Sequence, residues 1–507
     1  MPRRSVARFI AFLSSAALAL GCHDGGTEPR GVSGITTIAG AGATDTVQSN
    51  AVRLTVEVRD AEGRLTSGAE DVEFTVARTG AGASRVAFVC VQPSAICGDT
   101  KYASATSDSY VAVPADAHGR ATATVRLGGV AGPTWIYVTV PMLRLRDSVR
   151  VEVKPGNAYA IVGAPEDTAV VPGAQFTAGG TVVDRFGNRR TDAVALTGTS
   201  AGLLASGATV TAAAFGPQEL RLAAGAITRT IAVSVVPAGQ IVAGRYQAGL
   251  VVMNSDGTAR RTIAMPAGVQ QEYPVGAPAW LGTDVLYQGT SAAVGTRLYV
   301  ADAAGASRRL LPADNTVSET LPHANAAGDV FYYARDVGAA SSTLRVRRAS
   351  TGVSEPLTTQ GAPIAASSYA VPPAGADVAF LDFVDFSNRY VFLSRGGAAR
   401  AMTDQLANAL SYSPDGTRIA YINAGYSALM VMNADGTGAR VVATRAPAAQ
   451  SYTSVDWTAD GRWLLVGHPY NLPGGSLEYR AELVEVATGI VMILPSTRGL
   501  EQAAWRR

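Results

Sequence analysis

The sequence is poor in lysine, histidine and cysteine. Its 507 residues include two lysines, four histidines and three cysteines. Arginine therefore supplies nearly all of the positive charge, and the formal net charge of the chain is only +2. A chain without a strong net charge lacks the general attraction to phosphate groups on which nucleic-acid-binding proteins depend. We therefore expect no nucleic-acid partner.

Long amphipathic helical patterns are also missing after residue 30. Charged residues make up only 16% of the chain, and glycine occurs 54 times. Apolar and polar residues instead alternate in short runs that turn residues interrupt about every ten positions, which is typical of antiparallel sheets. The predicted fold class is therefore all-β. A chain of this length is too long for one core and should hold roughly three or four domains.

The apolar run near the N-terminus, residues 9–20, is too short to span a membrane as a stable helix. Three arginines precede it, and Gly21 and Cys22 follow it, which indicates an export signal. The stretch LALGC resembles the lipobox of bacterial lipoproteins. This resemblance implies that residues 1–21 are removed as a signal peptide and that Cys22 carries lipid. An ordinary secretory signal with an incidental cysteine is the alternative.

The residues after Cys22 bear on where the anchor would go. His23 stands where the simplest inner-membrane retention signal of lipoproteins has aspartate. The resemblance therefore implies an exported, membrane-anchored lipoprotein of the outer membrane, in the periplasmic or the surface-facing leaflet. Residues 22–32 are polar and rich in glycine, which is typical of a flexible tether.

Cys90 and Cys97 are the only other cysteines, and a Pro-Ser turn lies between them. An isolated cysteine pair in an exported chain predicts a local disulfide. Two cysteines without a histidine nearby in the sequence cannot complete a zinc site. We therefore expect no metal and no other cofactor.

Two successive stretches, residues 33–154 and residues 155–237, share the alternating pattern. In the first, VEVRDAEGRLTSGAEDVEFTV and DAHGRATATVRLGGVAGPTWIYVTV resemble bacterial immunoglobulin-like domains of the invasin and intimin type. The second repeats the arrangement of strand, Asp184-x-x-Gly187 turn and strand more loosely. The resemblance implies two β-sandwiches, the second degenerate, which together would form a stalk.

Residues 238–507 contain an internal repeat of about 45 residues with four short strand patterns in each copy, which is the signature of a β-propeller. An aromatic or small residue opens each unit, and these residues are Trp280, Ala324, Tyr369, Tyr412, Trp457 and Trp505. We expect the aromatic members to pack in blade cores rather than to stack on a ligand.

The two ends of the repeat region complement each other. The region begins with a second-strand pattern at Gln240 and ends with a first-strand pattern that contains Trp505. The last strand should therefore complete the first blade and give six blades with no unpaired edge at the seam. The stretches YSPDGTRIAY and LMVMNADG resemble the TolB-type propeller repeat, which implies the same fold for residues 238–507.

Two Asp-Gly segments, NSDGT and NADGTG, have the spacing of part of a calcium loop. A complete loop of that kind needs a glutamate at its twelfth position and flanking helices, and the sequence supplies neither. Asn, Asp and Gly between apolar strands are typical of hairpin turns. The prediction for these two segments is therefore hairpin turns. We also predict that the protein is not an enzyme.

His323 and one long insertion are the remaining candidates for a site. His323 precedes the first position of a repeat unit, which predicts a place in the central channel. Residues 466–483 form the longest insertion in any repeat, and loops on a rigid scaffold often bind partners. The candidate contact residues in this insertion are His468, Tyr470, Asn471, Leu472 and Tyr479.

The sequence as a whole predicts a cell-envelope lipoprotein whose propeller binds a protein partner through one face. A carbohydrate-binding or adhesive surface protein is one alternative, since an invasin-like stalk would suit it. A hydrolase or lyase with its site in the propeller channel is the other, and it would need carboxylates or histidines gathered from several blades.

Overall fold

The computed structural model describes part of the chain: residues 34–47, 52–66, 70–76, 86–89, 96–97, 110–245, 249–270, 278–302, 304–311, 316–360, 362–364, 368–375, 377–383, 389–395, 398–423, 425–445, 452–471, 477–500 and 502–507. Within these ranges the only helical segment is the single 3₁₀ turn η1 (Pro495–Thr497), and the other regular elements are strands. The predicted all-β class is confirmed. None of the helical structure in these ranges is long and apolar enough to cross a membrane.

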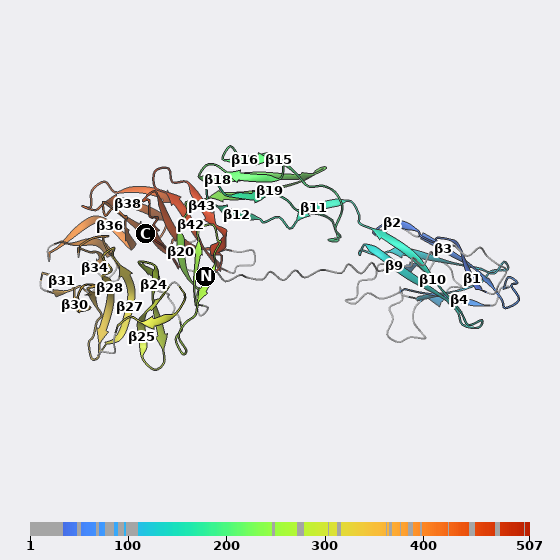
Figure 1. The fold of residues 1–507 in the computed structure, drawn as a ribbon, viewed down its shortest axis with the longest axis horizontal. Coiled ribbons are helices and arrows are strands. Elements are labelled where there is room, and N and C mark those ends of the chain that lie inside the picture. Colours follow the sequence, from blue (N-terminus) through green and yellow to red (C-terminus); the bar gives the residue numbers. More distant parts are fainter. Residues whose placement is uncertain are drawn as a thin grey trace, which may run out of the picture. The chain divides into compact units, whose positions relative to one another are not determined.

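The chain divides into two compact units, which Figure 1 shows as ribbons. Unit 1 comprises Met1–Tyr159 with Val183–Arg190, and unit 2 comprises Ala160–Val182 with Thr191–Arg507. The strands β11 (Ala158–Val162) and β14 (Thr181–Asp184) lie where the chain passes from one unit to the other.

The cysteine predictions fall outside the described residues. Cys22 and Cys90 are not described, and of Cys97 only the backbone is. Lipidation and the disulfide therefore stay predictions.

Unit 1 contains two sheets that enclose one core of valine, leucine, isoleucine and phenylalanine side chains. The strand orders are β1-β3-β8-β5 and β2-β10-β9-β4-β7-β6. The strands are β1 (Gly34–Ala39), β2 (Thr44–Thr46), β3 (Val52–Arg59), β4 (Asp71–Val76), β5 (Val86–Val89), β6 (Ile96–Cys97), β7 (Tyr110–Pro114), β8 (Arg120–Leu127), β9 (Gly132–Val140) and β10 (Leu145–Lys154).

Strand β9 shows how the alternating sequence builds this core. Ile136 and Val138 are fully buried, whereas Trp135 and Tyr137 are 45% and 48% exposed. Successive residues of a strand point to opposite faces of the sheet. One face of β9 therefore packs on the core, and the other carries two exposed aromatic rings.

A turn at residues 184–188 belongs to unit 1. The carboxylate of Asp184 accepts hydrogen bonds from the backbone N–H groups of Gly156 and Asn188 at 2.8 and 2.9 Å. The amide side chain of Asn188 donates to the carbonyl of Gly129 at 2.7 Å and accepts from the N–H of Ala131 at 2.9 Å. These bonds fasten the turn to residues that lie far away in the sequence.

Unit 2 begins with two small sheets, ordered β12-β19-β18-β15 and β13-β17-β16. Their strands are β12 (Asp167–Val170), β13 (Gln175–Thr177), β15 (Ala195–Thr199), β16 (Leu203–Ser206), β17 (Thr209–Ala212), β18 (Gly216–Ala224) and β19 (Ile227–Val235). These sheets pack on the rest of unit 2. The ring of Phe215 lies 6.3 Å from that of Trp463, and Arg498 pairs with Asp167 at 2.7 Å.

The remainder of unit 2 is a β-propeller (Figure 1). Among the described residues it contains four larger sheets. Their strand orders are β22-β21-β20-β44, then β23-β24-β25-β27-β28-β29-β30, then β33-β34-β35-β36-β37-β38-β39, and finally β40-β41-β42-β43. In the second of these sheets, β26 also pairs with β25. The strands are β20 (Gln240–Arg245), β21 (Gly249–Asn254), β22 (Arg261–Ile263), β23 (Ala279–Leu281), β24 (Asp284–Ser291), β25 (Gly295–Ala301), β26 (Ser307–Arg309), β27 (Thr316–Ala324), β28 (Val330–Asp336), β29 (Thr343–Arg347), β30 (Ser354–Pro356), β31 (Thr358–Thr359), β32 (Ala362–Pro363), β33 (Ser368–Ala370), β34 (Ala379–Phe383), β35 (Arg389–Arg395), β36 (Ala398–Tyr412), β37 (Arg418–Asn423), β38 (Ala428–Asn433), β39 (Arg440–Thr444), β40 (Ser454–Trp457), β41 (Trp463–Asn471), β42 (Leu477–Glu485), β43 (Val491–Leu494) and β44 (Gln502–Trp505).

The central strands of the propeller pack on both faces. Tyr287 of β24 shares a core cluster with Val242 of β20, whereas its neighbour Leu286 shares one with Tyr332 of β28. Adjacent residues of a strand thus face different neighbouring groups of strands. This explains why central strands are continuous apolar runs such as LVVMN and LMVMN rather than alternating ones.

The first and last strands of the repeat region lie in one sheet. β44 pairs antiparallel with β20, and this places Trp505 opposite Ile241 and Gln502 opposite Gly244. The pairing that the repeat register predicts is therefore present.

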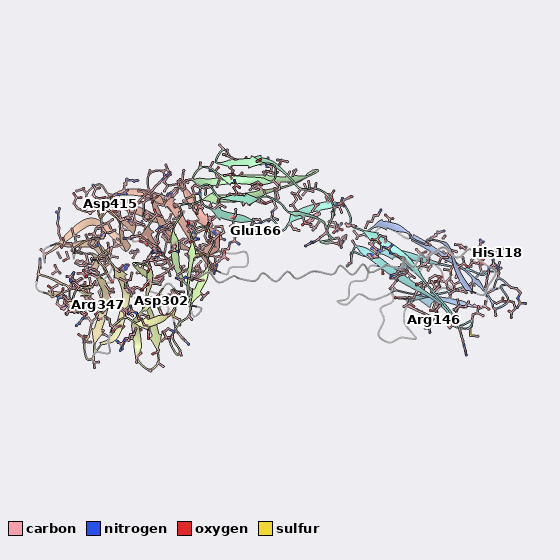
Figure 2. The ribbon with its side chains drawn as sticks, in the orientation of Figure 1. His118, Arg146, Glu166, Asp302, Arg347 and Asp415 are labelled. Carbon is pink, nitrogen blue, oxygen red and sulfur yellow. The ribbon has the colours of Figure 1, made fainter. Side chains whose placement is uncertain are left out.

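The Asp-Gly segments NSDGT and NADGTG are hairpin connections, because β21 pairs with β22 and β38 pairs with β39 across them. A similar turn joins β36 to β37. Asp415, labelled in Figure 2, accepts hydrogen bonds from the hydroxyl of Ser413 at 2.5 Å and the N–H of Thr417 at 3.0 Å. The bond from Ser413, and then that from Thr417, lowers the pKa of Asp415 to about 2. Gly416 has a φ of 71°, a left-handed conformation that glycine adopts without strain. The turn chemistry thus accounts for the acidic residue.

Candidate functional site

A cavity of about 650 Å³ lies in the channel of the propeller. Residues of β23, β27, β33, β36, β40 and β44, which are the first strands of the repeats, line it together with the turns that follow these strands. Most of the lining side chains are alanine, proline, valine or aromatic. The walls are therefore mainly apolar, and a few polar groups define what the cavity can bind.

Asp456 is held by three neighbours inside this cavity. Its Oδ1 accepts hydrogen bonds from the hydroxyl of Ser411 at 3.0 Å and from the guanidinium of Arg507. Its Oδ2 accepts the backbone N–H of Trp505 at 2.9 Å. Arg507 also donates to Ser411 Oγ at 2.7 Å. Groups on or next to β36, β40 and β44 therefore converge on one carboxylate.

The cavity carries a single balanced pair of charges. Among the residues that line it, all of which the structure describes, Asp456 has the only carboxylate side chain and Arg507 is the only arginine or lysine. The side chain of Asp456 is 16% exposed and that of Arg507 is 32% exposed. In the part of the chain that the structure describes, no group of three or more His, Cys, Asp or Glu side chains is placed to hold a metal ion.

His323 enters the cavity wall from a β-bulge. The register of β27 against β28 shifts between Thr320 and His323, and Leu321 has a φ of 52°. A positive φ is costly for leucine, and strain of this kind concentrates at functional sites. The hydroxyl of Tyr369 donates to the carbonyl of Leu321, and its ring meets that of His323 edge-on at 4.9 Å. The bulge thus presents the imidazole to the channel.

The polar atoms beside the charged pair are neutral. Burial lowers the pKa of His323 to about 4, with Asp456 opposing this shift and Arg507 adding to it. The imidazole is therefore uncharged at pH 7, with one donor and one acceptor nitrogen. Ser454 also lines the cavity, but its hydroxyl oxygen is buried and has no hydrogen-bond partner among the described residues. The partly exposed imidazole of His323 can serve a bound molecule.

The insertion at residues 466–483 forms a long hairpin. β41 continues to Asn471 and β42 begins at Leu477, and the two strands pair along their whole length. Leu472 lies outside the described residues, and nothing is described of the Asn471 side chain. Tyr479 is partly exposed on β42. Residues 466–483 were predicted as an extended loop, and among those that the structure describes, residues 466–471 and 477–483 lie in two paired strands.

His468 is completely buried in this hairpin, so the prediction that it contacts a partner at the surface is wrong. Its Nε2 lies 2.9 Å from Glu482 Oε1, although the N–H direction is not aligned for an ideal hydrogen bond. Its Nδ1 lies 3.0 Å from the carbonyl of Pro469. The Pro469 carbonyl and the Glu482 carboxylate both only accept hydrogen bonds, so each ring nitrogen of His468 faces an acceptor.

Glu482 is the centre of the network around His468. The hydroxyl of Tyr470 donates to Oε1, and the guanidinium of Arg445 donates to Oε2. Burial by itself would raise the pKa of Glu482, but His468, Tyr470 and Arg445 together lower it. Burial, and then the bond to Glu482, raises the pKa of Tyr470, and Arg480 stacks on its ring at 3.9 Å. These contacts stabilise the hairpin from within.

Sequence reasoning found His323 but missed Ser411 and Asp456. All three immediately precede a position that opens a repeat unit, and the residue after Ser411 and the residue after Asp456 are the buried aromatics Tyr412 and Trp457. Neighbouring strand residues point to opposite faces. A residue next to a core aromatic of a first strand therefore faces the channel, and this signal was present in the sequence.

No protein-family model and no curated protein sequence matches the chain. Among solved structures, TolB from Acinetobacter baumannii is similar at 14% identity, covering 60% of this chain and 81% of that one, with a TM-score of 0.42. A putative TolB from Agrobacterium tumefaciens is similar at 13% identity, covering 54% and 100%, with a TM-score of 0.38. A chain of a nidogen/laminin complex is similar at 12% identity, covering 53% and 98%, with a TM-score of 0.39. Likenesses at this level say nothing about function, which has to come from the chain's own residues.

Proposed function

We propose that this protein is an exported lipoprotein, anchored through Cys22 in the outer membrane, whose propeller binds a protein partner without catalysing a reaction. The single observation that carries the binding role is the channel cavity of about 650 Å³, with its apolar walls and its few polar groups. A cavity of this kind suits the insertion of side chains from a partner segment.

A closed ring of six blades is part of this proposal. Core clusters shared by neighbouring groups of strands support it, since one of them joins Leu465 of β41 to Ile241 of β20, between the last group and the first. The β20–β44 pairing supports it as well. The two sheets of unit 1 around one core, and the two small sheets of unit 2, support the immunoglobulin-like stalk.

The contacts of Asp456 favour recognition over catalysis. A general base needs a free lone pair directed at a substrate proton. Here the Ser411 hydroxyl, the Trp505 N–H and the Arg507 guanidinium occupy three of the roughly four acceptor positions of the carboxylate. Arg507 also compensates its charge. The pair therefore favours a polar binding contact over proton transfer.

Blocking the mouth of the channel tests the proposal. Ala459 is exposed and lines the cavity, so Ala459→Trp should fill the mouth with little effect on the fold. Ala339, exposed in the turn between β28 and β29 and not part of the cavity lining, gives the matched control Ala339→Trp. The measurement is co-purification of partner proteins after chemical cross-linking of intact cells. Loss of a partner with the first variant alone supports the channel, whereas equal recovery with both contradicts it.

The anchor has its own test. Cys22→Ser should move the protein from the membrane fraction to the soluble fraction. Unchanged membrane association of this variant would contradict lipidation at Cys22.

Carbohydrate binding is the second candidate, because Trp135 and Tyr137 lie exposed on the same face of β9. Aromatic rings can stack on the apolar faces of sugars, and Arg150 and Ser148 opposite them on β10 can hydrogen-bond hydroxyl groups. Glycan-array binding that disappears in Trp135→Ala, without recovery of any protein partner, would favour this function.

A further inference from the structure

We propose that the channel recognises a basic side chain of the partner, arginine above all, and that Arg507 occupies this place in the free protein. The inference rests on the proposed function, because it assumes that the partner enters the channel. It adds the chemical identity of the group that enters.

Arg507 is the displaceable member of the cluster around Asp456. Ser411 and Trp505 lie in paired strands, and their bonds to the carboxylate need no long side chain. Arg507 lies beyond the last backbone bond of its segment, which runs from the Arg506 N–H to the carbonyl of Gln240 at 2.9 Å. Its guanidinium stands at the end of a flexible chain and is twice as exposed as Asp456, at 32% against 16%. Replacing it leaves the rest of the cluster intact.

The charge of the cavity selects what replaces Arg507. When the guanidinium moves out, Asp456 is the only charged side chain left among the lining residues, since the His323 imidazole is uncharged at neutral pH. A partly buried carboxylate between apolar walls needs a counter-charge. The vacated position therefore attracts a cation and repels an anion, including any acidic segment of a partner.

The site already holds a guanidinium. Asp456 Oδ1 and Ser411 Oγ lie close enough together that one nitrogen of Arg507, Nη2, bonds to both. The arginine of a partner could take the same place and make the same charge-assisted bonds. The apolar walls match the aliphatic stem of an arginine side chain.

Small probes test this without knowledge of the partner. The probe is N-acetyl-L-arginine N-methylamide, and the citrulline compound of the same shape, which lacks the charge, is its control. Calorimetric titration of the full-length protein should show weak binding of the arginine probe, because Arg507 competes with it. Arg507→Ala should bind that probe roughly tenfold or more tightly, and added salt should weaken this binding. The citrulline probe should show no gain.

Matched variants decide the outcome. Arg506 bonds to Gln240 and lies over the Trp280 ring at 5.6 Å, so Arg506→Ala removes a neighbouring arginine without freeing Asp456. It should leave the affinity for the arginine probe unchanged, and Asp456→Asn combined with Arg507→Ala should abolish the gain. An equal gain in Arg506→Ala, or no gain in Arg507→Ala, overturns the proposal. If Ala459→Trp still abolishes partner recovery, only the arginine preference fails and the channel proposal stands.

Discussion

At the scale of the residue, His323 gives the clearest dependence on pH. The folded protein lowers its pKa to about 4, whereas an unfolded histidine titrates near 6.5. The unfolded state binds more protons between these values, so this contribution to stability is complete above about pH 6.5 and is lost as the pH falls toward about 4. It should amount to about 1–3 kcal/mol, a range that allows for partial exposure.

Replacing His323 measures this contribution. In His323→Gln, the free energy of unfolding should fall less between about pH 7 and about pH 4.5 than in the wild-type protein. His118→Gln, at an exposed position of unit 1, is the control and should keep the wild-type dependence. The measurement is urea denaturation followed by tryptophan fluorescence. The same acid sensitivity in all three proteins would contradict a His323 whose pKa is lowered in the folded state.

Glu482 should stabilise the protein in the neutral range. Its pKa is lowered in the folded state, so its contribution is present above the unfolded value of about 4.3 and is lost as the pH falls through the folded value. Glu482→Gln leaves Arg445 and His468 without their carboxylate and should cost about 3–5 kcal/mol at pH 7.

The control for Glu482 is Glu478→Gln in the same strand. Glu478 pairs with Arg480 at 3.0 Å and is 22% exposed against 4% for Glu482, so its loss should cost about 1 kcal/mol or less. Denaturation midpoints in urea compare the two variants. Equal losses would show that the network around Glu482 does not hold the hairpin.

The residues that sequence reasoning missed share one physical cause. Ser411 and Asp456 precede buried aromatics in first strands, which is a local signal for a place in the channel. That signal does not show that the two side chains bond to each other. Arg507 joins them only through the pairing of β44 with β20, which brings together residues far apart in the sequence. Channel position could therefore be predicted from strand alternation, but the cluster required the assembled sheet.

At the scale of the element, the apolar central strands were predictable and the β41–β42 hairpin was not. Polar residues such as His468 and Glu482 interrupt the apolar pattern, which favours a loop in the sequence. In the structure His468 lies against Glu482, and Tyr470 and Arg445 donate hydrogen bonds to Glu482. These contacts offset the cost of burying the polar groups. Buried polar side chains that pair with one another leave no periodic pattern in the sequence.

The strand β44 should contribute strongly to stability. The Trp505 side chain is 3% exposed and belongs to the cluster that joins β44 to β20 and β41. Trp505→Ala should therefore cost about 3–5 kcal/mol and speed amide exchange in β20. Thermal melting and hydrogen exchange measure these effects.

The control is Trp135→Ala, at a position that is 45% exposed, which should change the free energy of unfolding by about 0.5 kcal/mol or less. A Trp505→Ala protein as stable as this control would contradict the closure of the sheet by β44.

At the scale of the molecule, the small sheets and the propeller of unit 2 should unfold together. Ala169 of β12 and Val236, the residue after β19, belong to a propeller core cluster, and Asp167 pairs with Arg498. Differential scanning calorimetry with hydrogen exchange should show one cooperative loss of protection across unit 2. Phe215→Ala, which removes the ring contact with Trp463, should weaken this coupling. Independent exchange of the small sheets in the wild-type protein would contradict it.

The repeat predicted the propeller, but the sequence did not predict that the small sheets would pack on it. A repeat is visible because each copy must bury the same faces. The contacts of the small sheets come instead from scattered residues such as Asp167 and Phe215, which follow no period. Contacts of this kind between a repeat and its flanking segment appear only in the assembled structure.

Site-specific photo-cross-linking in intact cells tests the central claim, partner binding in the channel, most directly. A photoreactive amino acid at Ala326 or Ala459, two exposed positions of the cavity lining on different repeats, should give an adduct with the same protein. The same amino acid at Ala339 should give none. Adducts at Ala339 alone, or no protein adduct at either lining position, would contradict the account.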